Sequence, residues 1–225
     1  EIDVVEEKPL VGAMAKALGT AQTPEVLDAL SDERLLKLRK VYEKELAKQL
    51  PDAAQTVVDK LPLNICNAAL IHRVFPDALF ILSLRHPCDC VLSCFMQNFR
   101  LNGAMANCLT IEGAARLYDE VLGLWQMIGS ALAPNHVEVR YEDLIRDVEG
   151  TCRPVIDALG ADWNDDLLDH RATARKRGGV RTPSYSQVSQ PIYSRAEGRW
   201  RNYRAELKPV LPILEPWIEA LGYDV

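Results

Sequence analysis

The chain has 225 residues, of which 48% are hydrophobic, and a net charge of −6 at pH 7. This length allows one large or two small domains with an ample apolar core. The sequence contains no run of about 18 apolar residues, so a membrane-spanning helix is not expected. Residues 1–7 are acidic and do not resemble a signal peptide, but this carries little weight because the chain is expected to begin within a domain.

The six cysteines lack the spacing of a disulfide framework. Three of them, Cys88, Cys90 and Cys94, lie close together in the sequence, but no second pair of ligands accompanies them and we expect no zinc site. We therefore expect reduced, mostly buried thiols, which are typical of a cytoplasmic protein.

Charge is unevenly distributed along the chain. Residues 171–204 contain nine Lys or Arg and one acid, Glu197, and carry a net charge of +8, so the remainder carries −14. The acidic remainder argues against a nucleic-acid-binding protein. A solvated basic loop and a site for a compact anionic ligand both fit this segment.

Short strands and amphipathic helices alternate along the first third of the chain. Residues 2–5 and 56–58 are expected to form short strands. Amphipathic helices are expected at 10–18, 24–30 and 31–50. Ser31 is the expected N-cap of the third helix. The apolar stripe of that helix predicts ordinary core packing by Leu35, Leu38, Tyr42, Leu46 and Leu50.

Lys60 follows the second strand almost directly. A lysine that leaves a strand at the carboxyl edge of a sheet is suited to act as a point charge on an anionic group in transfer. A solvated loop cation fits the same position, so both interpretations stay open. A helix over residues 64–74 is expected next.

Residues 78–97 form the pattern on which the functional interpretation depends. An apolar run ends at Arg85, His86-Pro87 breaks the chain direction, and a helical pattern follows from Asp89. Arg85 should then lie at the end of a buried strand, with Ser93 about one turn into the helix. An arginine and a hydroxyl at such a corner are suited to bind a phosphate group. A structural ion pair for Arg85 remains the alternative.

The rest of the chain continues the alternation of strands and helices. Residues 136–141 read as a strand that delivers Tyr141 and Glu142 to its far end. Residues 171–204 read as a long irregular segment. The other elements expected here are a polar loop near a substrate entrance at 97–110 and helices at 111–132, 147–159, 163–170 and 210–221. This order predicts an α/β fold with a mostly parallel sheet.

Several separated segments resemble the sulfotransferase family, most closely its protein-tyrosine and tetratricopeptide-linked branches. Arg85, followed eight positions later by Ser93, resembles the motif that binds a 3′-phosphate in that family. Four further segments are similar to family motifs: the strand-end lysine segment 58–62, the tyrosine segment 139–144, the nucleotide-covering residues 184–191 with 198–200, and the usual C-terminal finish at 221–223.

The resemblance implies a single sulfotransferase domain over residues 1–225, with a P-loop-NTPase-like parallel sheet flanked by helices. It also implies in-line transfer of a sulfuryl group from 3′-phosphoadenosine 5′-phosphosulfate (PAPS) to an acceptor hydroxyl, with 3′-phosphoadenosine 5′-phosphate (PAP) as product and no metal. The implied donor-binding residues are Arg85, Ser93, Tyr141 and Arg199. The implied catalytic residues are Glu7 as general base, for which Glu6 is the alternative, with Lys60 and Ser184.

Protein tyrosine, a carbohydrate and a small alcohol or phenol all fit as acceptor, and a homodimer is compatible with the sequence. Two departures from the family pattern stand out. The chain contains no Gly/Ser/Thr-rich 5′-phosphosulfate loop, so we expect that residues upstream of Glu1 supply this loop and the first strand, and that the chain alone is not a competent enzyme. Gln97 stands where the nearest branch often has an arginine.

Three other functions compete with that of a sulfotransferase. A catalytically silent phosphonucleotide-binding module or scaffold of the same fold is the alternative that stays open. A P-loop kinase is disfavoured because the G-x-x-x-x-G-K-[ST] pattern does not occur in the sequence. A basic-loop nucleic-acid binder would require a steep salt dependence of DNA binding.

Overall fold

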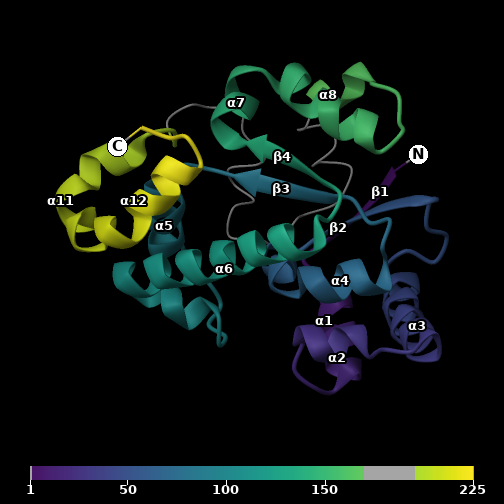
Figure 1. The fold of residues 1–225 in the computed structure, drawn as a ribbon. Helices are drawn as coiled ribbons and strands as arrows, with labels where there is room; N and C mark the ends of the chain where they lie inside the picture. The colour runs from purple at the N-terminus through teal and green to yellow at the C-terminus, as the bar shows by residue number, and fades with distance from the viewer. Residues whose placement is uncertain (1, 170–195, 225) are drawn as a thin grey trace. The chain divides into compact units, whose positions relative to one another are not determined.

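The computed structural model describes residues 2–169 and 196–224. The chain divides into two compact units. The first unit comprises Glu1–Phe80 and Gly123–His136, and the second comprises Ile81–Leu122 and Val137–Val225. Figure 1 labels the elements of both units. Whether these units act as one domain, as the sequence suggests, stays a prediction.

The first unit is built on two parallel strands, β1 (Ile2–Glu6) and β2 (Thr56–Lys60). Their register pairs Ile2 with Thr56 and Glu6 with Lys60, so both strands end at the same edge. Parallel strands need a long crossover connection. The crossover contains α1 (Leu10–Leu18), α2 (Pro24–Asp28) and α3 (Asp32–Gln49). After β2 come the 3-10 helix η1 (Pro62–Asn67) and α4 (Ala68–Val74).

Local sequence signals set the ends of these helices. The Ser31 hydroxyl accepts a hydrogen bond from the Arg34 amide at 3.3 Å and caps α3, as predicted. Gly19 ends α1 in the left-handed conformation with φ of 77°. The apolar faces then pack into one core, whose buried members are Val11, Met14, Leu18, Leu27, Leu38, Leu70 and Val74.

The second unit contains the pair β3 (Phe80–Leu84) and β4 (His136–Arg140), whose first residues belong to the first unit. β3 leads into α5 (Pro87–Met96), and β4 leads into α7 (Tyr141–Arg146) and α8 (Val148–Ala158). Between them lie η2 (Met105–Leu109) and α6 (Ile111–Leu132), which begins in this unit. The C-terminal elements are η3 (Asp165–Leu168), η4 (Arg199–Tyr203), α11 (Arg204–Leu207), η5 (Lys208–Val210) and α12 (Leu211–Ala220).

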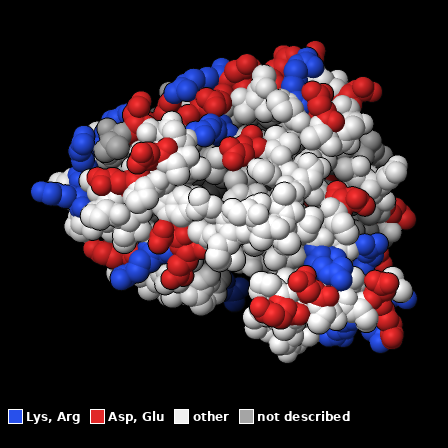
Figure 2. Space-filling view, in the orientation of Figure 1, with Lys and Arg blue, Asp and Glu red and all other residues white. Residues whose placement is uncertain are grey.

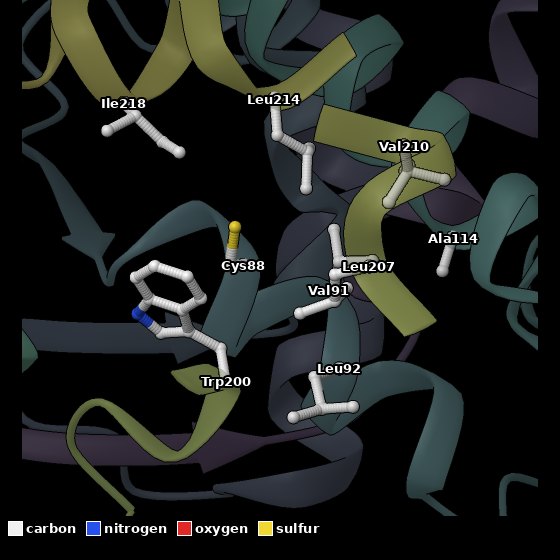
Figure 3. Packing of buried hydrophobic residues seen from close by; sticks show 10 residues of the cluster. Cys88, Val91, Leu92, Ala114, Trp200, Leu207, Val210, Leu214 and Ile218 are labelled. Carbon is white, nitrogen blue, oxygen red and sulfur yellow. The ribbon is translucent and has the colours of Figure 1, made fainter. Parts of the chain in front are cut away.

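The core of the second unit joins α5 to the start of α6 and to the C-terminal helices (Figure 3). The indole of Trp200 is 1% exposed and is one of the largest buried side chains. The other buried members are Cys88, Val91, Leu92, Ala114, Ala115, Leu207, Val210, Leu214 and Ile218. This packing fixes α5 against residues that come more than 100 positions later in the chain.

Several predicted elements differ from the structure in their bounds. The helix expected at 163–170 is only the 3-10 turn η3, and α7 was not predicted. Within the predicted irregular segment 171–204, the described residues 199–203 and 204–207 form η4 and α11. The helix expected at 64–74 begins as the 3-10 helix η1. Helices α1 and α6 have the predicted bounds.

All six cysteines are free thiols, as predicted. Cys88 and Cys108 are buried, Cys66 is exposed and the other three are half-buried, so fewer thiols are buried than expected. No helix in the described part of the chain combines the length and the apolar character that crossing a membrane requires. On the face shown in Figure 2, basic and acidic side chains are interspersed.

Candidate active site

Arg85 and His86 form the turn that connects β3 to α5. The His86 Nδ1 accepts a hydrogen bond from the Cys88 amide at 3.2 Å, which makes His86 the N-cap of α5, and Pro87 occupies the first helical position. The His86 Nε2 lies 3.0 Å from the Asp224 carbonyl oxygen. Because a carbonyl only accepts, Nε2 carries the proton and Nδ1 is free to act as the cap. The corner is therefore held by both ring nitrogens.

The Arg85 guanidinium lies at this corner without a carboxylate partner among the described residues. Its Nη2 donates to the Ala196 carbonyl oxygen at 2.5 Å, and its carbon lies 4.8 Å from the centre of the Tyr141 ring. Its Nε is buried and has no hydrogen-bond partner in the described part of the chain. Such an orphaned donor is the kind of group that an anionic ligand would satisfy.

Ser93 lies nearly two turns into α5 rather than one, because the helix begins at Pro87 and not at Asp89. Its neighbours Val91 and Leu92 are buried, whereas Ser93 itself is exposed. The hydroxyl is thus accessible on the outer face of the helix that follows Arg85.

The other two predicted donor-binding residues belong to the same unit. Tyr141 begins α7 and lies against the Arg85 guanidinium, so the structure brings these two residues together. Arg199 begins η4 three residues after Ala196, and its guanidinium is exposed at 5.8 Å from the centre of the Tyr203 ring. The backbone that carries Arg199 is therefore adjacent to Arg85, while its side chain extends over Tyr203.

Glu7 and Lys60 meet at the carboxyl ends of β1 and β2 in the first unit. The Lys60 Nζ lies 3.2 Å from the Glu7 Oε1, and the Glu7 amide donates to the Lys60 carbonyl at 2.8 Å. Both side chains stay accessible, at 38% and 44% exposure. Glu6 is half-buried, and the Glu7 carboxylate contacts the Lys60 ammonium at the surface.

The backbone at Glu7 is unusual. Its φ of 53° is in the left-handed region, which costs a residue with a Cβ atom about 1–3 kcal/mol. The same conformation turns the chain out of β1 toward Pro9 and α1. Strain of this kind concentrates at functional sites, where the surrounding structure holds it.

A polar network that the sequence did not reveal supports the end of β2. The Asp59 carboxylate accepts hydrogen bonds from the Tyr42 hydroxyl at 3.3 Å and from the Asn64 side-chain amide at 3.4 Å. Burial raises the pKa of Asp59, and burial together with the Asp59 charge raises the pKa of Tyr42. The network anchors the residue before Lys60 to α3 and η1.

A second support missed by the sequence holds the Arg85 corner. The buried Glu142 carboxylate accepts from the His86 amide and from the Tyr223 hydroxyl, both at 3.0 Å. Burial, together with the charge of Glu142 and the hydrogen bond to it, keeps the pKa of Tyr223 above its usual value. The Tyr223 hydroxyl therefore remains a donor to Glu142, and the C-terminal residues stabilise the turn that carries Arg85.

Two further points concern the predicted site. Ser184, the third predicted catalytic residue, lies outside the described residues. Among the residues that the structure describes, no group of three or more His, Cys, Asp or Glu side chains is placed to hold a metal ion.

The chain is similar to proteins of several organisms. It is 28% identical over 191 residues to an uncharacterized protein of Aquifex aeolicus (strain VF5), covering 84% of this chain and 25% of that protein. It is 24% identical over 215 residues to protein-tyrosine sulfotransferase 2 of Gallus gallus, covering 90% of this chain and 53% of that protein. The chain thus spans about a quarter of the first relative and about half of the second.

Two solved structures share the fold. The sulfotransferase domain from the curacin biosynthetic pathway aligns with a TM-score of 0.60 and 15% identity over 100% of this chain and 98% of that one. The sulfotransferase domain from the Synechococcus PCC 7002 olefin synthase aligns with a TM-score of 0.53 and 19% identity, covering 100% and 96%. The predicted α/β fold, with parallel strands flanked by helices, is confirmed.

The model of the sulfotransferase family matches residues 7–165, well over half of the chain. The matched stretch begins at Glu7 and contains Lys60, Arg85, Ser93 and Tyr141, whereas Arg199 lies beyond it. Most of the residues on which the resemblance was based therefore lie within the matched region. The chain belongs to the sulfotransferase family.

Proposed function

We propose that this protein transfers a sulfuryl group from PAPS to the hydroxyl of an acceptor. The observation that carries the proposal is the Arg85 guanidinium at the strand–helix corner of a sulfotransferase-family chain, where its buried Nε has no partner among the described residues. A phosphate group would satisfy this donor, and an arginine binds phosphate through parallel N–H···O bonds.

The donor would be held by the residues around the Arg85 corner. Arg85 and the accessible Ser93 hydroxyl would bind the 3′-phosphate, with Arg199 adding a second positive charge. The Tyr141 ring packs against the guanidinium and limits its orientation. This set of residues fits an anionic ligand because no described carboxylate neutralises Arg85.

Glu7 and Lys60 would supply the chemistry. The acceptor oxygen attacks sulfur in line as its proton passes to the Glu7 carboxylate, and the bond from sulfur to the bridging oxygen of the 5′-phosphate breaks. Lys60 stabilises the negative charge that develops on that bridging oxygen, and PAP leaves. Ser184 would assist Lys60. The 3.2 Å contact between Glu7 and Lys60 supports this assignment, because it holds a proton-accepting carboxylate beside a cation at an exposed edge.

The acceptor is proposed only as a hydroxyl compound. Because several relatives are protein-tyrosine sulfotransferases, tyrosine-containing peptides are the first acceptors to test, followed by a simple phenol and a carbohydrate.

The test is transfer of radioactive sulfate from labelled PAPS by the full-length protein. We expect PAP to form in proportion to the labelled acceptor. Tight binding of PAP without transfer to any acceptor would indicate the silent phosphonucleotide-binding module instead. Absence of PAP binding would refute both functions.

A further inference from the structure

Asp89 is a buried carboxylate that accepts hydrogen bonds from two backbone amides. It is the third residue of α5 and is 1% exposed. Its Oδ2 accepts from the Gly198 amide at 2.7 Å, and its Oδ1 accepts from the Trp200 amide at 2.8 Å. Hydrogen bonds to an ionised group are short and strong, and the first turn of a helix favours a negative charge.

The backbone at Gly198 is shaped to meet this carboxylate. Its φ of 65° lies in the left-handed region, and a Cβ atom there would lie 2.5 Å from the Arg201 Nη1. A left-handed residue next to helical ones forms a concave arrangement of amides that binds an anionic oxygen. Here Asp89 supplies the oxygens, so the segment folds around its side chain.

Other contacts hold the same stretch, residues 196–200, which we call the docked segment. The Trp200 ring stacks on His86 with centres 4.8 Å apart and an angle of 20° between the planes. Figure 3 shows Trp200 beside Cys88 in the core of the second unit. Arg85 donates to Ala196, and Arg146 forms an ion pair with Glu197. The docked segment is thus tied to the turn and helix that carry Arg85 and Ser93.

Arg199 lies between the two amides that Asp89 holds. Its backbone is therefore fixed by the carboxylate, whereas its guanidinium is exposed, at 5.8 Å from the centre of the Tyr203 ring. We infer that Asp89 is a positioning residue for donor binding, which holds Arg199 where its guanidinium adds to the 3′-phosphate site of Arg85 and Ser93. This inference rests on the proposed function.

The test compares PAP with 5′-AMP, which lacks the 3′-phosphate, by calorimetry on the full-length protein. Asp89→Asn keeps one acceptor but places an amide NH₂ against the second backbone N–H. We expect PAP affinity to fall roughly tenfold or more, as for a hydrogen bond to a charged group, with 5′-AMP affinity little changed. Glu206→Gln, which removes an exposed acid from α11, is the matched control and should leave both affinities unchanged.

A double-mutant cycle separates positioning from general stabilisation. If Asp89 acts through Arg199, then Asp89→Asn should weaken PAP binding by less than about twofold when Arg199→Ala is already present. The inference would be overturned if Asp89→Asn lowered the affinities for PAP and 5′-AMP equally. It would also be overturned if the losses of PAP affinity from Asp89→Asn and Arg199→Ala multiplied in the double variant. Should Asp89→Asn fail to fold, Gly198→Ala disturbs the same segment with Asp89 intact and should show the same PAP-selective loss.

Hydrogen exchange at the Gly198 and Trp200 amides gives a readout independent of ligand. Exchange should accelerate in Asp89→Asn and not in Glu206→Gln. Unchanged exchange together with unchanged PAP affinity would overturn the inference alone. Failure of the wild-type protein to bind PAP would instead refute the proposed function, which keeps the two failures distinct.

Discussion

Glu7→Gln separates a catalytic role of this residue from a structural one. The substitution preserves the shape of the side chain but removes the charge that meets the Lys60 ammonium at 3.2 Å. Since both side chains are more than one third exposed, the lost ion pair should change the free energy of unfolding by less than about 1 kcal/mol. Loss of a general base should instead slow turnover by roughly 10²- to 10⁴-fold.

The assay combines kcat from labelled sulfate transfer, the dissociation constant of PAP from calorimetry, and the unfolding free energy from urea titration. We expect kcat to fall while PAP affinity and stability stay nearly unchanged. Glu6→Gln is the matched control from the neighbouring position. Full turnover in Glu7→Gln would refute the assignment, and a loss confined to Glu6→Gln would move the base by one residue.

Three further predictions test the core, the donor site and the thiols. Leu38, at 1% exposure in α3, lies in the core, so Leu38→Ala should lower the free energy of urea unfolding by about 2–5 kcal/mol. Leu36→Ala, at 52% exposure in the same helix, should change it by no more than about 0.5 kcal/mol, and equal losses would contradict the described core. Ser93→Ala should weaken PAP binding roughly 3- to 10-fold in calorimetry without a measurable loss of stability, and an unchanged affinity would remove the hydroxyl from the site. Burial raises the pKa of Cys88 to about 11, so at pH 8 only about one Cys88 thiol in a thousand is ionised. Cys88 should therefore react with a disulfide reagent only after unfolding, and rapid reaction in the native protein would contradict its burial.

Local patterns predicted the parts of the site that depend on strand ends. Lys60 and Arg85 follow short apolar runs, and the carboxyl ends of such strands are where polar side chains gather in α/β folds. The helical period of α3 and its Ser31 cap could also be predicted, because both depend on residues within a few positions of each other.

The supports of the site could not be predicted because their partners are distant in the sequence. Asp89 meets an amide 111 positions later, and Glu142 meets a hydroxyl 81 positions later. Periodicity and capping rules describe neighbours along the chain and contain no information on such pairs. The sequence identified Asp89 only as the start of a helical pattern, whereas the structure shows its carboxylate buried.

Binding of PAP to the full-length protein with and without the Arg85 guanidinium tests the central claim most directly. Calorimetry should show that Arg85→Ala weakens PAP binding by about 2–4 kcal/mol, roughly 30- to 900-fold, as for one partner of a buried charged hydrogen bond. Arg153→Ala, which removes an arginine from an exposed ion pair with Glu149, should leave the affinity unchanged. An Arg85→Ala variant that binds PAP as tightly as the wild type would contradict the account.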